Sequence, residues 1–334
     1  PVYTHEVIDP RNNNKVMGRY QSASTARAGR DRLDNKYGAY RYQVRRIETK
    51  APSFQKREPD IGAALQDRID NDFDALVQEY NKLDGTDGGK TLDADIAREL
   101  SPEYRADRSR SGEVHDAVGN FVDKLYDRRI DETSPDGVVV LMAGGGGAGK
   151  SSSKDILADI YSSADIVFDG TLSTYKSAKE RVQKALDAGQ AVNISYIYRE
   201  PAEAVRNGVL PRAMKTGRTV PLNGLVKGHA GSNEVIRKLQ EEFGDNPAFK
   251  IYAIDNSRGE NQAALIDVKD IPVVQREGLR EELKNVVDEE YKAGRISEKI
   301  YEATVGEAPP ETKAVRQQDE KGVRQGRESG GERD

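Results

Sequence analysis

Short apolar runs alternate with helical segments along the central part of the chain. Three runs, over residues 138–143, 164–169 and 190–200, are rich in β-branched residues and too short for buried helices, which is typical of strands covered on both faces. Helical periodicity predicts helices over 173–189, 200–218 and 232–244, with a loop over 219–229 and a last strand over 249–257. Strands and helices that alternate in this way require a parallel sheet with helices on both faces, so an α/β fold is predicted.

The first fifty residues have a different pattern. Alternating segments predict strands over 3–9, 15–22 and 39–48, with a helix over 22–38, which together form a small ββαβ module. This stretch holds eleven Lys or Arg residues against five Asp or Glu, a local balance of 11 − 5 = +6. Its basic residues and tyrosines could contact nucleic acid or a virion, but an ordinary solvated helix face is the favoured interpretation.

The remaining segments complete a division into five parts. Prolines at 52 and 59 mark a linker, and residues 61–83 form one amphipathic helical pattern that we expect to pack on the central fold. A short strand over 91–95 and a helix over 113–130 come next. The predicted parts are a basic module (1–50), a linker and helix (51–90), a kinase-like domain (91–275), a charged helical extension (276–305) and a tail expected to be disordered (306–334).

Composition limits the classes of function. The chain has 334 residues, a net charge of −5 and no run of 18 apolar residues, so we expect no membrane contact and a cytoplasmic location. Delivery by a phage or a mobile element stays open as a route to that location. The absence of cysteine excludes disulfides and thiolate metal sites, and three histidines disfavour a multi-histidine metal site.

A glycine-rich loop follows the apolar run at 138–143. Gly144, Gly149, Lys150 and Ser151 fit G-x-x-x-x-G-K-[ST], with a strand before the loop and a predicted helix after it. Bare backbone N–H groups and one ammonium can enclose the phosphates of ATP, and the serine hydroxyl can bind Mg²⁺. A flexible linker ahead of a serine helix cap would not explain the strand directly upstream. The predicted nucleotide-binding residues are Gly144, Gly145, Gly146, Gly147, Ala148, Gly149, Lys150, Ser151 and Ser152.

Phosphoryl transfer also needs carboxylates and further positive charge. Asp95 and Asp169 follow predicted strands, and Arg212 and Arg218 lie in one segment that the alternation returns towards the phosphates. Each aspartate could instead cap a helix or a turn, and each arginine could be an ordinary surface residue. For His229, a role as a turn cap is favoured over substrate binding.

From the phosphate loop to about residue 259, the sequence resembles the zeta-toxin-type P-loop kinases. The resemblance is carried by "AGGGGAGKSS", "VFDGTL" and "RAMKTGRTVP". It implies a kinase that uses ATP and Mg²⁺ to phosphorylate a small hydroxyl substrate, with UDP-N-acetylglucosamine as the family's substrate. By resemblance, Arg212 and Arg218 contact the ATP phosphates, and Asp169 and Thr171 belong to the acidic-Gly-Thr pattern at the substrate, with Asp169 and Ser151 near the metal.

One departure from the family concerns the order of segments. The pattern D-x-x-R-x-x-x-P-x-Y, which the family places after the phosphate loop, occurs upstream as "DADIARELSPEY" and supplies Asp95, Arg98, Pro102 and Tyr104. We therefore expect a permuted order in which Asp95 is the catalytic base, Arg98 and Tyr104 are substrate residues, and the strand at 91–95 lies beside the phosphate-loop strand.

Two alternative functions stay open at this point. A P-loop ATPase or GTPase switch would use Asp169 as its metal ligand. A phage or mobile-element structural protein would keep the fold without the chemistry, which suits the basic first module and the charged tail. The family resemblance also leaves room for an antitoxin partner.

Overall fold

The computed structural model describes residues 3–47, 60–151, 154–258 and 262–310. Ser152, the prolines at 52 and 59, and residues 311–334 of the predicted tail lie outside the described residues.

The N-terminal module has the predicted ββαβ order. It consists of β1 (His5–Asp9), β2 (Lys15–Tyr20), α1 (Ala23–Tyr37) and β3 (Gln43–Arg46), and its antiparallel strands lie in the order β2-β1-β3. Helix α1 begins at a capping box between Ser22 and Thr25 and ends at Gly38, whose φ of 84° few other residues adopt. Among the described residues, four of the basic ones form ion pairs within the module, which are Arg19 and Arg45 with Glu6, Arg30 with Asp31, and Arg41 with Asp9.

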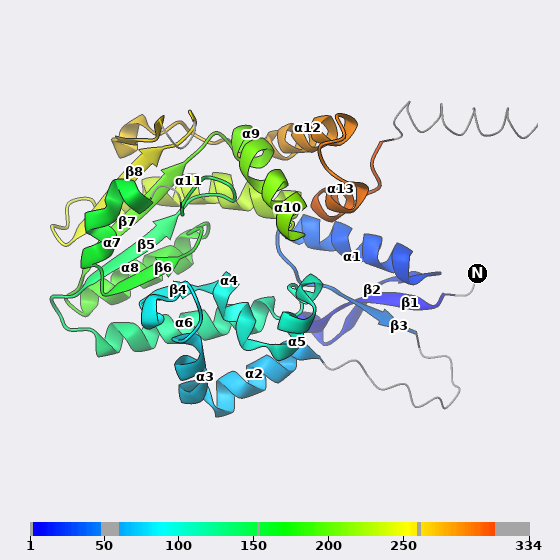
Figure 1. Cartoon of the computed structure of the whole chain (residues 1–334), viewed down its shortest axis with the longest axis horizontal. Helices are drawn as coiled ribbons and strands as arrows, with labels where there is room; N and C mark the ends of the chain where they lie inside the picture. Colours follow the sequence, from blue (N-terminus) through cyan, green and yellow to red (C-terminus); the bar gives the residue numbers. More distant parts are fainter. Residues whose placement is uncertain (1–2, 48–59, 152–153, 259–261, 311–334) are drawn as a thin grey trace, which may run out of the picture.

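A six-stranded sheet forms the centre of the molecule (Figure 1). Its order is β4-β6-β5-β7-β8-β9, where β4 is Thr91–Asp93, β5 is Val138–Ala143, β6 is Ile166–Asp169, β7 is Ala191–Tyr198, β8 is Phe249–Asp255 and β9 is Ala264–Ile266. The first five strands are parallel, as predicted, and the α/β fold class is confirmed. The edge strand β9 is antiparallel and was not predicted, because its side chains are largely exposed and carry no strand periodicity.

The position of β4 corrects one expectation. This strand pairs with β6 at the edge of the sheet and is separated from the phosphate-loop strand β5 by β6. The carboxyl ends of β4, β5 and β6 nevertheless share one edge, since all three strands are parallel.

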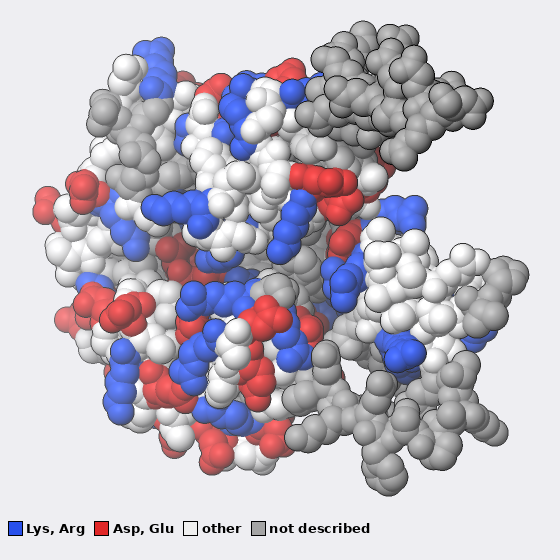
Figure 2. Space-filling view, turned by 45° about the vertical axis from the view of Figure 1, so that its right-hand side comes forward, with Lys and Arg blue, Asp and Glu red and all other residues white. Residues whose placement is uncertain are grey.

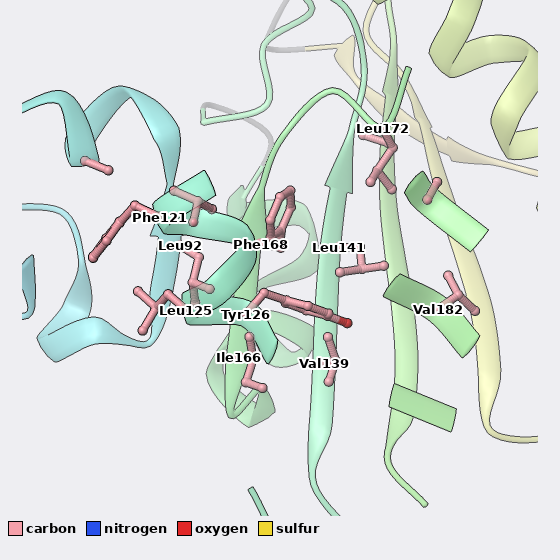
Figure 3. Packing of buried hydrophobic residues seen from close by; sticks show 14 of the residues in the cluster. Leu92, Phe121, Leu125, Tyr126, Val139, Leu141, Ile166, Phe168, Leu172 and Val182 are labelled. Atoms are coloured by element: carbon pink, nitrogen blue, oxygen red, sulfur yellow. The ribbon is translucent and has the colours of Figure 1, made fainter. Parts of the chain in front are cut away.

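Helices cover the sheet and build two cores. Helices α2 (Ile61–Asn71), α3 (Phe73–Tyr80), α6 (His115–Glu132), α8 (Tyr175–Asp187) and α11 (Leu222–Phe243) contribute to the main core on one face of the sheet. In this core Tyr126 of α6 packs edge-on against Phe168 of β6, next to Leu141 of β5 (Figure 3). On the other face, α7 (Ala158–Ser163) covers Val140 and Met142.

A second core lies beyond the carboxyl edge of the sheet. It joins α10 (Leu210–Thr216), α12 (Leu279–Lys292), α13 (Glu298–Val305), the π-helical turn Val205–Val209 and the first part of α11. The charged extension therefore has a buried apolar side, with Leu283 and Val287 fully buried. The short helices α4 (Ala94–Ala97), α5 (Pro102–Ala106) and α9 (Pro201–Ala204) complete this end of the molecule.

Two predicted helix boundaries were wrong. The single helix predicted over 61–83 divides at Asp72, where φ is −132° and ψ is 37°. The loop predicted over 219–229 is helical from Leu222 onward, because Leu222, Leu225 and His229 form one buried face in spite of two intervening glycines. Gly228 lies against the phosphate loop, where a Cβ would be in ordinary contact with Gly145, 3.6 Å from its Cα.

The segment after the phosphate loop is less helical than predicted. Its described part consists of a 3₁₀ turn (Lys154–Leu157) and the six-residue α7. Leu157 breaks the helical geometry between them, with φ of −115° and ψ of 29°, and its side chain packs into the sheet. Among the described residues, none of the helices has both the length and the apolar composition needed to cross a membrane.

Candidate active site

The phosphate loop leaves β5 in a conformation that depends on glycine. Gly144 has φ of 132°, and a Cβ there would lie 2.5 Å from the carbonyl oxygen of Ile197. Gly147 has φ of 75°, and its Cβ would lie 2.4 Å from the carbonyl oxygen of Ala204. The loop is therefore pressed against β7 and α9, where no side chain would fit.

Side chains from three other segments hold the carbonyl groups of this loop. Asn256 donates to Ala148 O over 2.8 Å, His229 Nε2 donates to Gly146 O over 3.0 Å, and Arg199 donates to Gly147 O over 3.2 Å. Within the described part of the chain, the N–H groups of residues 145–147 donate to no acceptor. These amides are thus free to donate to a bound anion.

Lys150 lies at the end of the loop, facing a group of carboxylates. Its ammonium donates to Gly144 O over 3.3 Å. Burial lowers the pKa of Lys150, and the negative charges of Asp169, Asp93 and Asp95 oppose that shift. These three aspartates come from the carboxyl ends of β4 and β6 and from α4, so the parallel sheet brings them to the lysine.

Asp95 is held between two arginines. One carboxylate oxygen forms an ion pair with Arg98, and the other lies 2.5 Å from the guanidinium of Arg218. Burial acts to raise the pKa of Asp95, but Arg98, Arg218 and the more distant Arg212 outweigh burial, so the pKa is lowered. Asp95 is therefore an ionised carboxylate near neutral pH.

Asp93 was not predicted as a site residue. It is the last residue of β4, directly opposite Asp169 in the register of β4 and β6, and it caps α4 by accepting from Asp95 N over 2.6 Å. Burial raises the pKa of Asp93 to about 6, and the charges of Asp169 and Asp95 add to that effect. Its place at the end of a strand was visible in the sequence, but the D-x-x-R pattern drew attention to Asp95 alone.

The other predicted site residues differ in their exposure and in their contacts. Arg98 is buried beside Asp95, whereas Tyr104 is 3% exposed and packs in the main core, so its ring presents little surface to a substrate. Thr171 is exposed and its carbonyl accepts from Gly144 N over 3.3 Å, which ties the loop after β6 to the phosphate loop. Arg212 is exposed on α10 and forms no ion pair with a described residue.

The groups available for a metal are few. Ser151 is exposed and Asp169 lies at the end of β6. Across the described ranges, no group of three or more histidine or acidic side chains is arranged to hold a metal ion by itself. A metal at this site would therefore need oxygen atoms from a nucleotide as well as from the chain, which is usual for Mg²⁺.

Comparison with known proteins finds a similarity to one protein family over part of the chain. The family model for zeta toxins matches residues 160–269, a stretch that begins after the phosphate loop and β4. No curated protein sequence matches the chain. A structure from the PezAT chromosomal toxin-antitoxin system of Streptococcus pneumoniae aligns with a TM-score of 0.33 and 14% identity, over 81% of this chain and 96% of that chain. The family-model match thus supports the zeta-toxin resemblance seen in the sequence over residues 160–269.

Proposed function

We propose that this protein is a kinase that transfers the γ-phosphate of ATP to a hydroxyl group of a small substrate. The observation that carries the proposal is the ion pair between Asp95 and Arg218, from distant segments, at the carboxyl edge of the sheet where the phosphate loop also places Lys150. Ligands bind at this edge in open α/β sheets. An ammonium, a guanidinium and an ionised carboxylate are the groups that phosphoryl transfer requires.

The residues at the carboxyl edge of the sheet fit ATP. The amides of residues 145–147 and the ammonium of Lys150 would donate to phosphate oxygens, and Arg212 and Arg218 would stabilise the charge that develops during transfer. Ser151 and Asp169 would hold Mg²⁺, which when bound supplies further positive charge to the phosphates.

Asp95 is the proposed base. The substrate oxygen attacks the γ-phosphorus while its proton passes to the carboxylate of Asp95, and the bond to the ADP oxygen breaks. Because Arg98 and Arg218 keep Asp95 ionised, it is in the correct state to accept a proton.

The acceptor that we propose is a nucleotide sugar such as UDP-N-acetylglucosamine, because residues 160–269 match the zeta toxins. Arg98 and Thr171 are the proposed substrate residues, whereas the burial of Tyr104 disfavours the direct substrate contact that the pattern implied for it. In this proposal residues 91–275 are the kinase-like domain, the helices of 51–90 support its core, and 276–305 support its far end.

The test uses the full chain with γ-labelled ATP, Mg²⁺ and a panel of uridine-diphosphate sugars. A new phosphorylated sugar is the expected product, and Lys150→Ala should lower its formation by at least about 100-fold because it removes a charge from the transferring phosphate. Lys176→Ala is the matched control, since that lysine is 86% exposed on α8. Release of free phosphate without a labelled sugar would identify an ATPase, and no turnover would refute the kinase.

A further inference from the structure

The N-terminal module contacts both sides of the proposed active site. Arg11 forms an ion pair with Asp116 at the start of α6, and Gly38 lies against the backbone of Asn223 at the start of α11. In Figure 1 the module lies between α5 below and α10 and α13 above. Figure 2 shows charged side chains of both signs around a hollow beside this end of the molecule.

Tyr40 joins the module to the segment that carries Arg218. Its hydroxyl donates to the carbonyl oxygen of Thr219 over 3.2 Å. On the other side, its ring packs edge-on against His115, with 6.4 Å between ring centroids, and covers Gly112, where a Cβ would lie 3.1 Å from the ring. Burial raises the pKa of Tyr40, while the Thr219 bond and the charge of Arg98 oppose that shift.

Thr219 belongs to the short segment that carries Arg218. This segment, residues 217–221, runs from the left-handed Gly217 at the end of α10 to Pro221 at the start of α11. A carbonyl fixed at Thr219 limits where the neighbouring Arg218 can place its guanidinium, which lies 2.5 Å from Asp95. The ends of the segment are held by backbone bonds, from Gly217 N to Ala213 O and from Leu225 N to Pro221 O. The bond from Tyr40 restrains the carbonyl of Thr219, between these ends.

We infer that the N-terminal module is part of the active site, and that Tyr40 is a positioning residue that holds the 217–221 segment so that Arg218 meets Asp95. This inference rests on the proposed kinase function. It assigns the module a role in catalysis in place of, or besides, contact with nucleic acid.

The test compares Tyr40→Phe with Tyr42→Phe in the full chain. Tyr42 lies in the same module, and its hydroxyl bonds to no described residue. Tyr40→Phe should lower kcat three- to tenfold, the range for one lost hydrogen bond, with KM for ATP unchanged, and Tyr42→Phe should leave both constants unchanged. Thermal melts of both variants check that the fold is kept.

Two further measurements separate positioning from a general structural effect. Tyr40→Phe should add no further loss of rate when Arg218 is already alanine, because the residue acts through that arginine. Amide hydrogen exchange over residues 216–221 should be faster in Tyr40→Phe than in the wild type. A rate loss of equal size in both backgrounds, or unchanged exchange, would overturn the inference. If the wild type phosphorylates nothing, the proposed function fails, while the exchange measurement still decides whether Tyr40 restrains the segment.

Discussion

Replacing His229 with glutamine should remove a large part of the protein's sensitivity to acid. His229 is 4% exposed, and its Nε2 donates to Gly146 O in the phosphate loop. Burial lowers the pKa of His229 to about 4, the charge of Lys150 lowers it further, and the Gly146 bond opposes the shift. Glutamine keeps a donor of similar reach but has no group that titrates in this range.

The change in unfolding free energy with pH follows from the pKa of His229 in the unfolded and in the native protein. The unfolded chain takes up a proton at His229 below the ordinary pKa of 6.5, whereas the native protein does so only near 4. Stability from this residue is therefore complete above pH 6.5 and is lost as the pH falls towards 4. The loss is about 2 kcal/mol between pH 7 and pH 5 and about 3 kcal/mol in full, at 1.36 kcal/mol per pH unit.

The assay is urea unfolding of the full chain at pH 7 and at pH 5. The wild type should lose about 2 kcal/mol more unfolding free energy between these conditions than His229→Gln. His5→Gln, at a partly exposed histidine of β1, should behave as the wild type. Other perturbed groups, such as His115, whose pKa burial lowers to about 4, and Asp93, are present in every protein compared and cancel. Equal losses in wild type and His229→Gln would refute the reasoning.

Three other changes have defined outcomes. Asp95→Asn should lower kcat by about 10²- to 10⁴-fold while ATP affinity, measured by calorimetry, is retained, and Asp93→Asn should lower kcat less. Gly147→Ala should lower the free energy of unfolding by more than about 1 kcal/mol, because φ at this residue is 75°. The control is Gly119→Ala in α6, which has open space around its Cβ and should be neutral or stabilising. Urea unfolding measures both variants. Leu283→Ala, fully buried in the second core, should cost about 2–5 kcal/mol in urea unfolding, and a smaller cost would show that the extension is not integral to the fold.

The sequence predicted best those elements whose periodicity comes from burial. Strands β5 and β7 are buried along almost their whole length, so both appear as continuous apolar runs. Helix α8 keeps polar residues on its outer face and ends before a glycine, and its predicted range of 173–189 differs little from Tyr175–Asp187. In these elements the local pattern and the tertiary environment agree.

The errors lie where tertiary packing outweighs local preference. Glycines 224 and 228 favour a loop, yet α11 begins at Leu222 because Leu222, Leu225 and His229 are buried on one face of the helix. The same packing turns His229 from a predicted turn cap into a buried support of Gly146. No local signal indicates such a role, since it depends on a partner 83 residues away.

The candidate site illustrates a different limit, which is the order of segments along the chain. The sequence motif placed Asp95 near the phosphates, but the expectation that its strand lies beside β5 was wrong, and β6 lies between them. A site at the edge of a sheet is formed by the strand ends that lie there. The carboxyl ends of parallel strands lie at the same edge whatever the order of the strands in the chain. The register of β4 and β6 then pairs Asp93 with Asp169, a juxtaposition that the motif does not encode because the two residues lie in segments on opposite sides of the phosphate loop. A permuted segment can thus be recognised by its sequence pattern. The residues that lie beside it in space, however, are known only from the strand order of the folded sheet.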